Sequence, residues 1–145
     1  MRAVIQRVRS ASVDVEGRTV GRIGDGVCVL LGVTHDDSVK TAETMAEKIW
    51  NLRIMPDEQG RIGRSIADAE GEVLLISQFT LYGDVSRGRR PSWVAAARPE
   101  LAEPLVEAVG AALRALGAKV ETGVFGADMQ VSINNDGPVT LIVDV

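Results

Sequence analysis

The sequence predicts an α+β fold, with one domain over residues 1–145 and a mostly antiparallel β-sheet or barrel core covered by two main helices. Short apolar runs with strand-like alternation are separated by brief turns, which favours antiparallel pairing. Two longer segments repeat apolar residues at the helical period. The 145 residues, 46% of them hydrophobic and 25% charged, suffice for one core. No linker, repeat or low-complexity tract divides them.

The first three strands are expected before residue 35. Residues 3–8 predict a strand, and the alternation over 13–20 predicts a hairpin that turns at Glu16-Gly17. A second turn is expected at 24–26, because it contains two glycines and an aspartate. The continuous apolar run 27–34 then predicts a central strand.

Two main helices follow from periodicity and capping residues. Apolar side chains recur at helical spacing over 39–52, after three residues, 36–38, that can each cap a helix. A second apolar face runs over 99–116, with a proline at its first position, although Pro104 could shift the start of the helix. A short helix over 93–97 is also expected.

The remaining apolar runs predict the later strands. The run over 73–80 predicts a buried strand, and the Gly-, Arg- and Pro-rich stretch 82–91 predicts a loop. The last strands are expected over 119–122, 129–133 and 139–143, and the final one could help to pair two subunits.

The charge balance limits the partners. A net charge of −4 argues against a generic nucleic-acid coat protein, whose affinity would come from many phosphate contacts. With only two Phe, one Tyr and two Trp, a base-stacking platform of the single-strand-binding kind is not expected. A few local cations could still dock one RNA end, and they form two groups: Arg2, Arg7 and Arg9, and Arg87, Arg89 and Arg90.

Composition also predicts a cytoplasmic protein with no membrane partner. No apolar run approaches the length of a membrane span, and Met1 leads into a strand pattern without the layout of a signal peptide. The single cysteine, Cys28, lies in an apolar run, which fits a reducing compartment and an unreactive thiol.

Two polar islands stand out against the apolar runs. The first, 77–83, ends a buried strand with hydroxyl and amide side chains, which are unusual for a core and usual for a site. The second, 135–140, contains Gly137-Pro138. From the residues alone a plain hairpin turn explains this second island well. A cis Gly-Pro bond is the alternative; its flanking carbonyls would form a rigid acceptor wall around a small chiral centre.

The two islands together resemble the D-aminoacyl-tRNA deacylase (D-tyrosyl-tRNA deacylase) family. The family's signature strings are Ser-Gln-Phe-Thr-Leu and Asn-x-Gly-Pro-x-Thr, and both stand unchanged here, at 77–81 and 135–140. The stretches 2–9, 88–92 and 125–129 also fit the family, so the resemblance covers the whole chain. It implies a homodimer whose active sites lie at the subunit interface.

The resemblance also implies a role for each candidate residue. The wall that meets the terminal adenosine and the scissile ester would be Ser77, Gln78, Phe79 and Thr80. The residues that face or support the amino acid would be Gly137 and Pro138 from the other subunit, Arg7, Asn135 and Thr140, which hold that loop, and Met129, which lines the pocket. From the residues alone, Met129 could equally pack in the core, and Arg7 could be a surface strand residue.

The sequence offers few side chains for acid–base chemistry. The only histidine, His35, is not placed near the first island, so a surface or capping role is expected for it. No Cys/His cluster, phosphate loop or dinucleotide pattern is present, and neither a metal nor a cofactor is expected. Backbone N–H groups of Phe79 and Thr80, at the end of the strand, are candidate oxyanion donors. Thr80 acting as a nucleophile with a nearby base is the alternative.

The function that the resemblance implies is editing of aminoacyl-tRNA. The enzyme would hydrolyse the ester at the tRNA 3′ end of D-aminoacyl-tRNA, and of glycyl-tRNA, while rejecting L-aminoacyl-tRNA through the Gly-Pro unit, and so keep translation homochiral. A relative with relaxed chirality that clears small L-amino acids is one alternative. A non-catalytic dimeric module that binds a small ligand or a nucleic-acid end is another, and turnover distinguishes the two classes.

Overall fold

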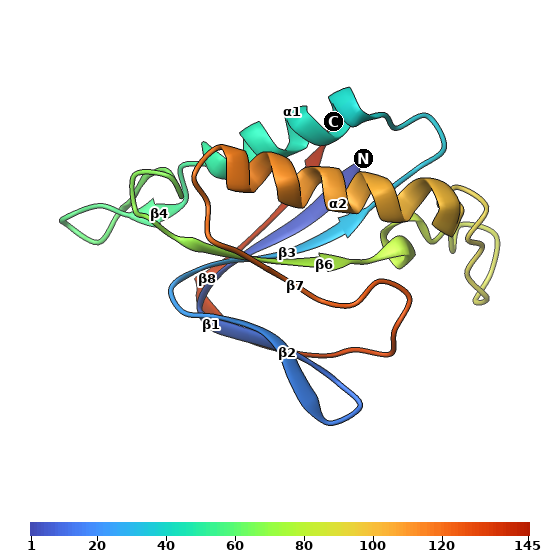
Figure 1. The fold of residues 1–145 in the computed structure, drawn as a ribbon, viewed down its shortest axis with the longest axis horizontal. Helices are drawn as coiled ribbons and strands as arrows, with labels where there is room; N and C mark the ends of the chain where they lie inside the picture. Colours follow the sequence, from blue (N-terminus) through green and yellow to red (C-terminus); the bar gives the residue numbers. More distant parts are fainter.

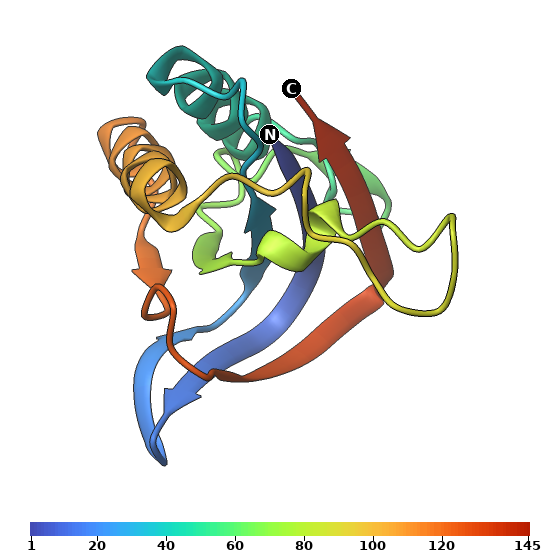
Figure 2. The ribbon, with the colours of Figure 1, turned by 90° about the vertical axis from the view of Figure 1, so that its right-hand side faces the viewer.

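The computed structural model describes residues 1–145, which form a strongly curved sheet with two helices packed side by side on one face (Figure 1, Figure 2). The helices are α1 (Val39–Trp50) and α2 (Pro99–Ala115), with a short 3-10 helix, η1 (Phe79–Tyr82). The strands are β1 (Arg2–Val15), β2 (Arg18–Ile23), β3 (Gly26–Gly32), β4 (Met55–Pro56), β5 (Ile62–Arg64), β6 (Glu72–Ser77), β7 (Val120–Thr122) and β8 (Gln130–Asp144).

The long strand β1 organises the sheet. Along one edge it pairs with β8 over nearly its whole length, and along the other it pairs first with β3 and then with β2, all antiparallel. Beyond β3 the sheet continues through β6 and β7, which pair in parallel. The parallel pairs arise because α1 and α2 lie in the connections that return the chain to the same end of the sheet. The predicted α+β class with a mostly antiparallel sheet is therefore confirmed, and the two parallel pairs are an addition.

Alternation along the central strands sends side chains to two apolar clusters. In β3 and β6, Val29 and Leu75 face the helices and belong to the larger cluster, whereas Cys28 and Leu74 belong to a smaller one inside the curl of the sheet. The curl brings β2 against β7, and a Cβ on Gly21 would lie 2.8 Å from the carbonyl oxygen of Thr122. Only glycine permits that approach, which nearly closes the sheet into a barrel.

Several local predictions are confirmed. Ser38 caps α1 through a capping box with Thr41, and Glu16-Gly17 form the β1–β2 turn, with φ of 50° and 74°. Helix α2 begins at Pro99 and continues through Pro104, which removes only one backbone donor near the start of the helix. Neither main helix is both long and apolar enough to cross a membrane.

Three predicted elements are wrong. The strand expected over 73–80 ends at Ser77, because Gln78 turns the chain into η1. The helix expected over 93–97 is a turn, closed by the Ala96 N–H bonded to the carbonyl of Trp93 at 3.0 Å. An isolated β-bridge joins Ser92 to Asp84, and another joins Ala96 to Thr34. These two bridges hold the segment extended on either side of the turn.

The third correction concerns the end of the chain. The strands expected over 129–133 and 139–143 are not joined by a hairpin; they are one strand, β8, and both halves pair with β1. Asn135 pairs with Val8 and Thr140 with Gln6, so four residues of β8 bulge opposite Arg7. Gly137-Pro138 lies in this bulge, and its peptide bond is cis.

Candidate functional site

A cavity of about 390 Å³ opens where β6 ends and α2 begins. Its apolar floor comes from β3 and α2, and Ser77, Gln78 and Phe79 reach it from the carboxyl end of β6 and from η1. Trp93, Arg98 and Phe125 complete its lining. A pocket of this size with few polar groups is typical of small-molecule and nucleotide sites.

Aromatic side chains gather around this cavity. Phe79 and Trp93 pack edge to face, with ring centroids 5.3 Å apart and an interplanar angle of 73°. Both remain largely exposed, at 55% and 42%. Gly83 permits this arrangement, because a Cβ there would lie 2.5 Å from the Trp93 ring. With Phe125 in the lining and Tyr82 at the end of η1, four of the five aromatic residues are at this end of the molecule.

The first signature string forms the polar edge of the cavity. The Gln78 N–H donates to the carbonyl of Leu31 at 2.7 Å, which anchors the chain to β3 just after β6 ends. The Gln78 side-chain amide donates to the hydroxyl of Thr80. Phe79 and Thr80 are the first two residues of η1, so their N–H groups have no acceptor within that helix. The predicted donors are therefore at the start of a helical turn rather than at the end of a strand.

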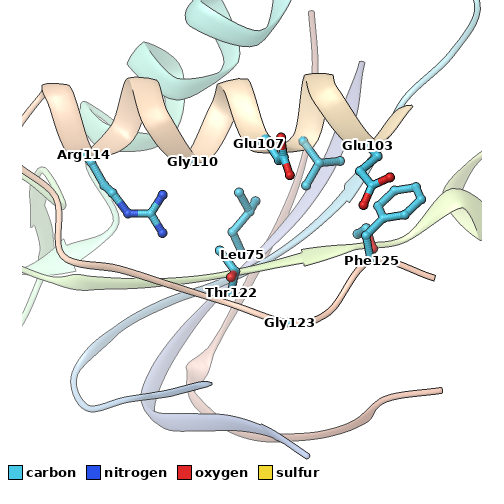
Figure 3. A pocket seen from close by; sticks show the side chains of 10 residues that line it. Leu75, Glu103, Glu107, Gly110, Arg114, Thr122, Gly123 and Phe125 are labelled. Carbon is cyan, nitrogen blue, oxygen red and sulfur yellow. The ribbon is translucent and has the colours of Figure 1, made fainter. Parts of the chain in front are cut away.

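A second, more polar cleft of about 410 Å³ adjoins the first between α2 and the strands β6 and β7 (Figure 3). The two cavities share Ser77, Val106 and Phe125. Figure 3 shows Glu107 and Arg114 extending from α2 toward the strands on either side of Gly110. The Arg114 guanidinium donates to the carbonyl of Val120 at 3.1 Å, which ties α2 to β7.

Charges near η1 are paired. The Arg2 guanidinium binds Asp144 through Nε at 2.8 Å and lies 5.6 Å from the centre of the Tyr82 ring. Hydrogen bonding to Arg2 lowers the pKa of Asp144. Burial, followed by the nearby Asp37 carboxylate, raises the pKa of Tyr82, so its phenol stays protonated at neutral pH.

The second signature string forms a separate group around Arg7. The Arg7 Nη1 donates to the carbonyl of Ile54 at 2.7 Å, and its Nε lies 2.9 Å from Asp136 Oδ2. That second contact is an ion pair without a hydrogen bond, because the Nε–H is not directed at the carboxylate. A Cβ on Gly137, whose φ is +111°, would lie 3.0 Å from Arg7 Nη2. The guanidinium therefore packs directly against the Gly137-Pro138 bulge.

Asn135 fixes the two ends of the same bulge. Its side-chain amide donates to the carbonyl of Arg7 at 2.9 Å and to that of Val139 at 3.2 Å. Its carbonyl oxygen accepts from the Thr140 hydroxyl at 3.5 Å. Gly137 and Pro138 themselves remain exposed, so the polar residues of the string hold the bulge and leave its tip accessible.

One chain does not bring the two groups together. Ser77 pairs with Leu31 of β3, and Leu31 pairs with Ala3 of β1, whereas Arg7 pairs with Val27. The Arg7 group is therefore four residues further along the sheet and on a different strand from the cavity. Met129 lies in neither group; it is half-buried and packs against the smaller apolar cluster.

No triad of side chains surrounds the cavity. The His35 ring bonds the carbonyl of Val94 through Nε2 at 2.7 Å, which fixes it against the 93–96 turn. No group of three or more histidine, cysteine or carboxylate side chains is placed to hold a metal ion. The sequence did not single out Trp93, Arg98 or Phe125 as site residues; the only signal was the family-like stretch 125–129.

Comparisons with known proteins agree with the geometry. A model of the family D-Tyr-tRNA(Tyr) deacylase matches residues 4–144. The chain is 59% identical over 144 residues to a curated D-aminoacyl-tRNA deacylase of Chloroflexus aurantiacus, covering 99% of this chain and 90% of that protein. It is 58% identical over 146 residues to the protein of the same name from Streptomyces coelicolor, with 100% of each covered.

Two solved structures share the fold. One, described as c-Myc DNA Unwinding Element Binding Protein, superposes with a TM-score of 0.94 at 42% identity, covering 100% of this chain and 99% of that one. The other, described as a probable eukaryotic D-amino acid tRNA deacylase, superposes with a TM-score of 0.88 over 99% and 98% of the two chains. At 17% identity, this second likeness concerns the fold alone.

Proposed function

The chain belongs to the D-Tyr-tRNA(Tyr) deacylase family, and from that premise we propose that it hydrolyses the ester of D-aminoacyl-tRNA in the cytoplasm. The observation that carries the proposal is the unchanged string 77–81 at a cavity lined by aromatic side chains. The string supplies hydroxyl, amide and free backbone N–H groups where an ester could lie. The cavity beside it has the size and the apolar lining that an adenosine requires.

The wall formed by Ser77, Gln78, Phe79 and Thr80 would meet the terminal adenosine and the ester. The N–H groups of Phe79 and Thr80 are free of helical acceptors and would stabilise the oxyanion that develops as water attacks the ester. The ester is already activated, and the neighbouring ribose 2′-hydroxyl of the substrate can position the water. No side-chain base is required on this account, which fits the placement of His35 against Val94.

The chirality of the substrate would be read by Gly137-Pro138 of a second subunit. Within one chain this bulge and the cavity lie on different parts of the sheet, so a homodimer is needed to combine them. Arg7, Asn135 and Thr140 would hold the bulge, as their contacts suggest. Met129 would contact the substrate only from a partner's side of the site, because it lines neither cavity of its own chain.

The proposed mechanism predicts an unusual substrate range. A rigid backbone wall excludes an L side chain by a clash and does not bind the D side chain, so it cannot exclude a substrate without a side chain. Glycyl-tRNA should be hydrolysed together with D-alanyl-tRNA, while L-alanyl-tRNA is spared. Pocket fit alone discriminates one methyl group by about 1–3 kcal/mol. A larger difference between the hydrolysis rates of glycyl-tRNA and L-alanyl-tRNA therefore indicates a steric clash with the L side chain.

The test is a side-by-side rate measurement for D-tyrosyl-, glycyl-, D-alanyl- and L-alanyl-tRNA at equal enzyme concentration. Hydrolysis of the D-tyrosyl ester supports the activity, and hydrolysis of the glycyl ester supports exclusion by a clash. If glycyl-tRNA resists as strongly as L-alanyl-tRNA, the enzyme recognises the D side chain and the wall mechanism is wrong. Binding of tRNA without turnover of any ester would instead favour the non-catalytic module.

A further inference from the structure

The loop over 84–91 carries three arginines, Arg87, Arg89 and Arg90, that are exposed and have no partner in the chain. None of them takes part in an ion pair. The arginines of the amino terminus differ, because Arg2 and Arg7 are both paired with carboxylates. In a chain whose net charge is −4, this loop is a local concentration of uncompensated positive charge.

The base of the loop is fixed at the mouth of the cavity. Asp84 and Ser92 exchange backbone hydrogen bonds at 2.9 and 2.8 Å, which closes the loop. The adjoining residues are Gly83, which packs against the Trp93 ring, and Trp93 itself, which lines the cavity. In Figure 2 the loop projects from this point away from the helices and beyond the edge of the sheet. A closed loop of this length can reach about 13 Å from its base.

The loop contains too few negative charges to neutralise its three arginines. Asp84 is the only carboxylate between 83 and 92, and its Oδ1 accepts the N–H of Ser86 at 2.8 Å at the base of the loop. Exposed apolar side chains, Val85 at 61% and Val94 at 82%, lie on either side of the three arginines in the sequence. Exposed arginines beside exposed aromatic and apolar groups are typical of a surface that binds a single-stranded nucleic-acid end.

We propose that the 84–91 loop binds the phosphates of the tRNA nucleotides that precede the terminal adenosine while that adenosine occupies the cavity. The inference rests on the proposed function and names the surface that holds the rest of the substrate. Guanidinium groups pair with phosphate oxygens in a bidentate manner, and their exposure lets them follow a flexible strand. The loop would then supply affinity for the polynucleotide, while the cavity supplies the chemistry.

The test compares two variants that each remove three positive charges. The first replaces the loop arginines: Arg87→Gln, Arg89→Gln and Arg90→Gln. The matched control replaces three exposed cations elsewhere, on β2 and α1, whose side chains form no hydrogen bond or ion pair: Arg18→Gln, Arg22→Gln and Lys40→Gln. Both have the same net charge, so only the position of the charges differs. Each is assayed on D-tyrosyl-tRNA and on D-tyrosyl-adenosine, a substrate without phosphates.

The loop variant should lose kcat/KM on D-tyrosyl-tRNA by on the order of 10-fold at low salt. It should retain wild-type kcat/KM on D-tyrosyl-adenosine. Between about 50 and 200 mM salt, the slope of log(kcat/KM) against log[salt] for the tRNA substrate should become shallower by about two units, since each single-strand phosphate contact contributes about 0.7. The control variant should keep the wild-type slope.

Equal losses on both substrates, or the same loss in the control variant, would overturn the proposal. So would a change in oligomeric state of the loop variant with no change in tRNA affinity. Binding of uncharged tRNA, followed by fluorescence anisotropy, separates this inference from the proposed function. If the wild type hydrolyses neither ester, the proposed function is wrong. The docking surface is then supported if the loop variant alone weakens tRNA binding, and it is refuted if the loop variant binds tRNA as the wild type does.

Discussion

Asp136 is the residue whose replacement best tests how the Gly137-Pro138 bulge is held. Its carboxylate lies between two arginines, with Oδ2 2.9 Å from Arg7 Nε and Oδ1 accepting from Arg9 Nε at 3.1 Å. Arg7 packs against the glycine of the bulge. The change Asp136→Asn keeps the size of the side chain and removes the charge that holds Arg7 in position.

The expected loss of stability follows from the exposure of each partner. The Arg7 side chain is 11% exposed and that of Asp136 20%, whereas that of Arg9 is 59% exposed. Breaking a buried ion pair costs about 3–5 kcal/mol, and an exposed pair contributes about 0–1 kcal/mol. Because Asp136 keeps some contact with solvent, we expect Asp136→Asn to lower the free energy of unfolding by about 2 kcal/mol. The control Arg9→Gln should cost less than about 1 kcal/mol.

Urea unfolding measures the stability of each variant, and rates on D-alanyl- and L-alanyl-tRNA measure selectivity. If Arg7 positions the bulge, Asp136→Asn should raise the rate on the L ester relative to the D ester by on the order of 10-fold, which corresponds to about 1.4 kcal/mol of lost discrimination. Arg9→Gln should leave the ratio unchanged. An unchanged ratio in a folded Asp136→Asn protein would refute the reasoning, as would equal destabilisation by the two changes.

Three further predictions concern other parts of the molecule. Thr80→Ala and His35→Ala should each retain deacylation within about 10-fold, and a loss on the order of 10⁴-fold in a folded variant would identify a side-chain nucleophile or base. Burial raises the pKa of the Cys28 thiol to about 12, so a disulfide reagent at pH 8 should modify it only after denaturation. Hydrogen bonds from Lys119 and then from the Gly24 N–H lower the pKa of Glu72. Glu72→Gln should therefore destabilise the protein at pH 7, and in urea unfolding at a series of pH values the difference should disappear as the pH falls through that lowered pKa.

Local patterns predicted the helices and the class of the fold, because capping and periodicity act within a few residues. Ser38 and Pro99 start helices where the sequence indicates. The errors arose where long-range pairing decides the structure. Turn residues at 135–138 indicated a hairpin, but pairing with the continuous strand β1 keeps both halves of β8 in line and turns the same residues into a bulge. The residues of 129–143 alone do not indicate that their partner strand, β1, is fourteen residues long.

Composition describes the charge and the aromatic content of the whole chain and not their distribution over its surface. Five aromatic residues and a net charge of −4 argue against an RNA-binding surface only if those residues are evenly spread. The fold places three of the aromatic residues in the lining of one cavity and a fourth, Tyr82, at the end of η1, and the three arginines of the 84–91 loop form no ion pair. A binding surface depends on the local density of aromatic side chains and positive charges. The order of the strands and the positions of the turns determine that density.

The division of the signature residues has the strongest consequence for function. The β1–β8 pairing extends from Arg2 with Asp144 to Asp14 with Gln130, on both sides of the Gly137-Pro138 bulge. Moving the bulge to Ser77 within one chain would break that pairing on both sides of the bulge. A site that uses both signature strings therefore requires a second copy of the chain. We expect activity to fall with dilution as the dimer dissociates, and full activity in a verified monomer would show that Gly137-Pro138 has no part in the reaction.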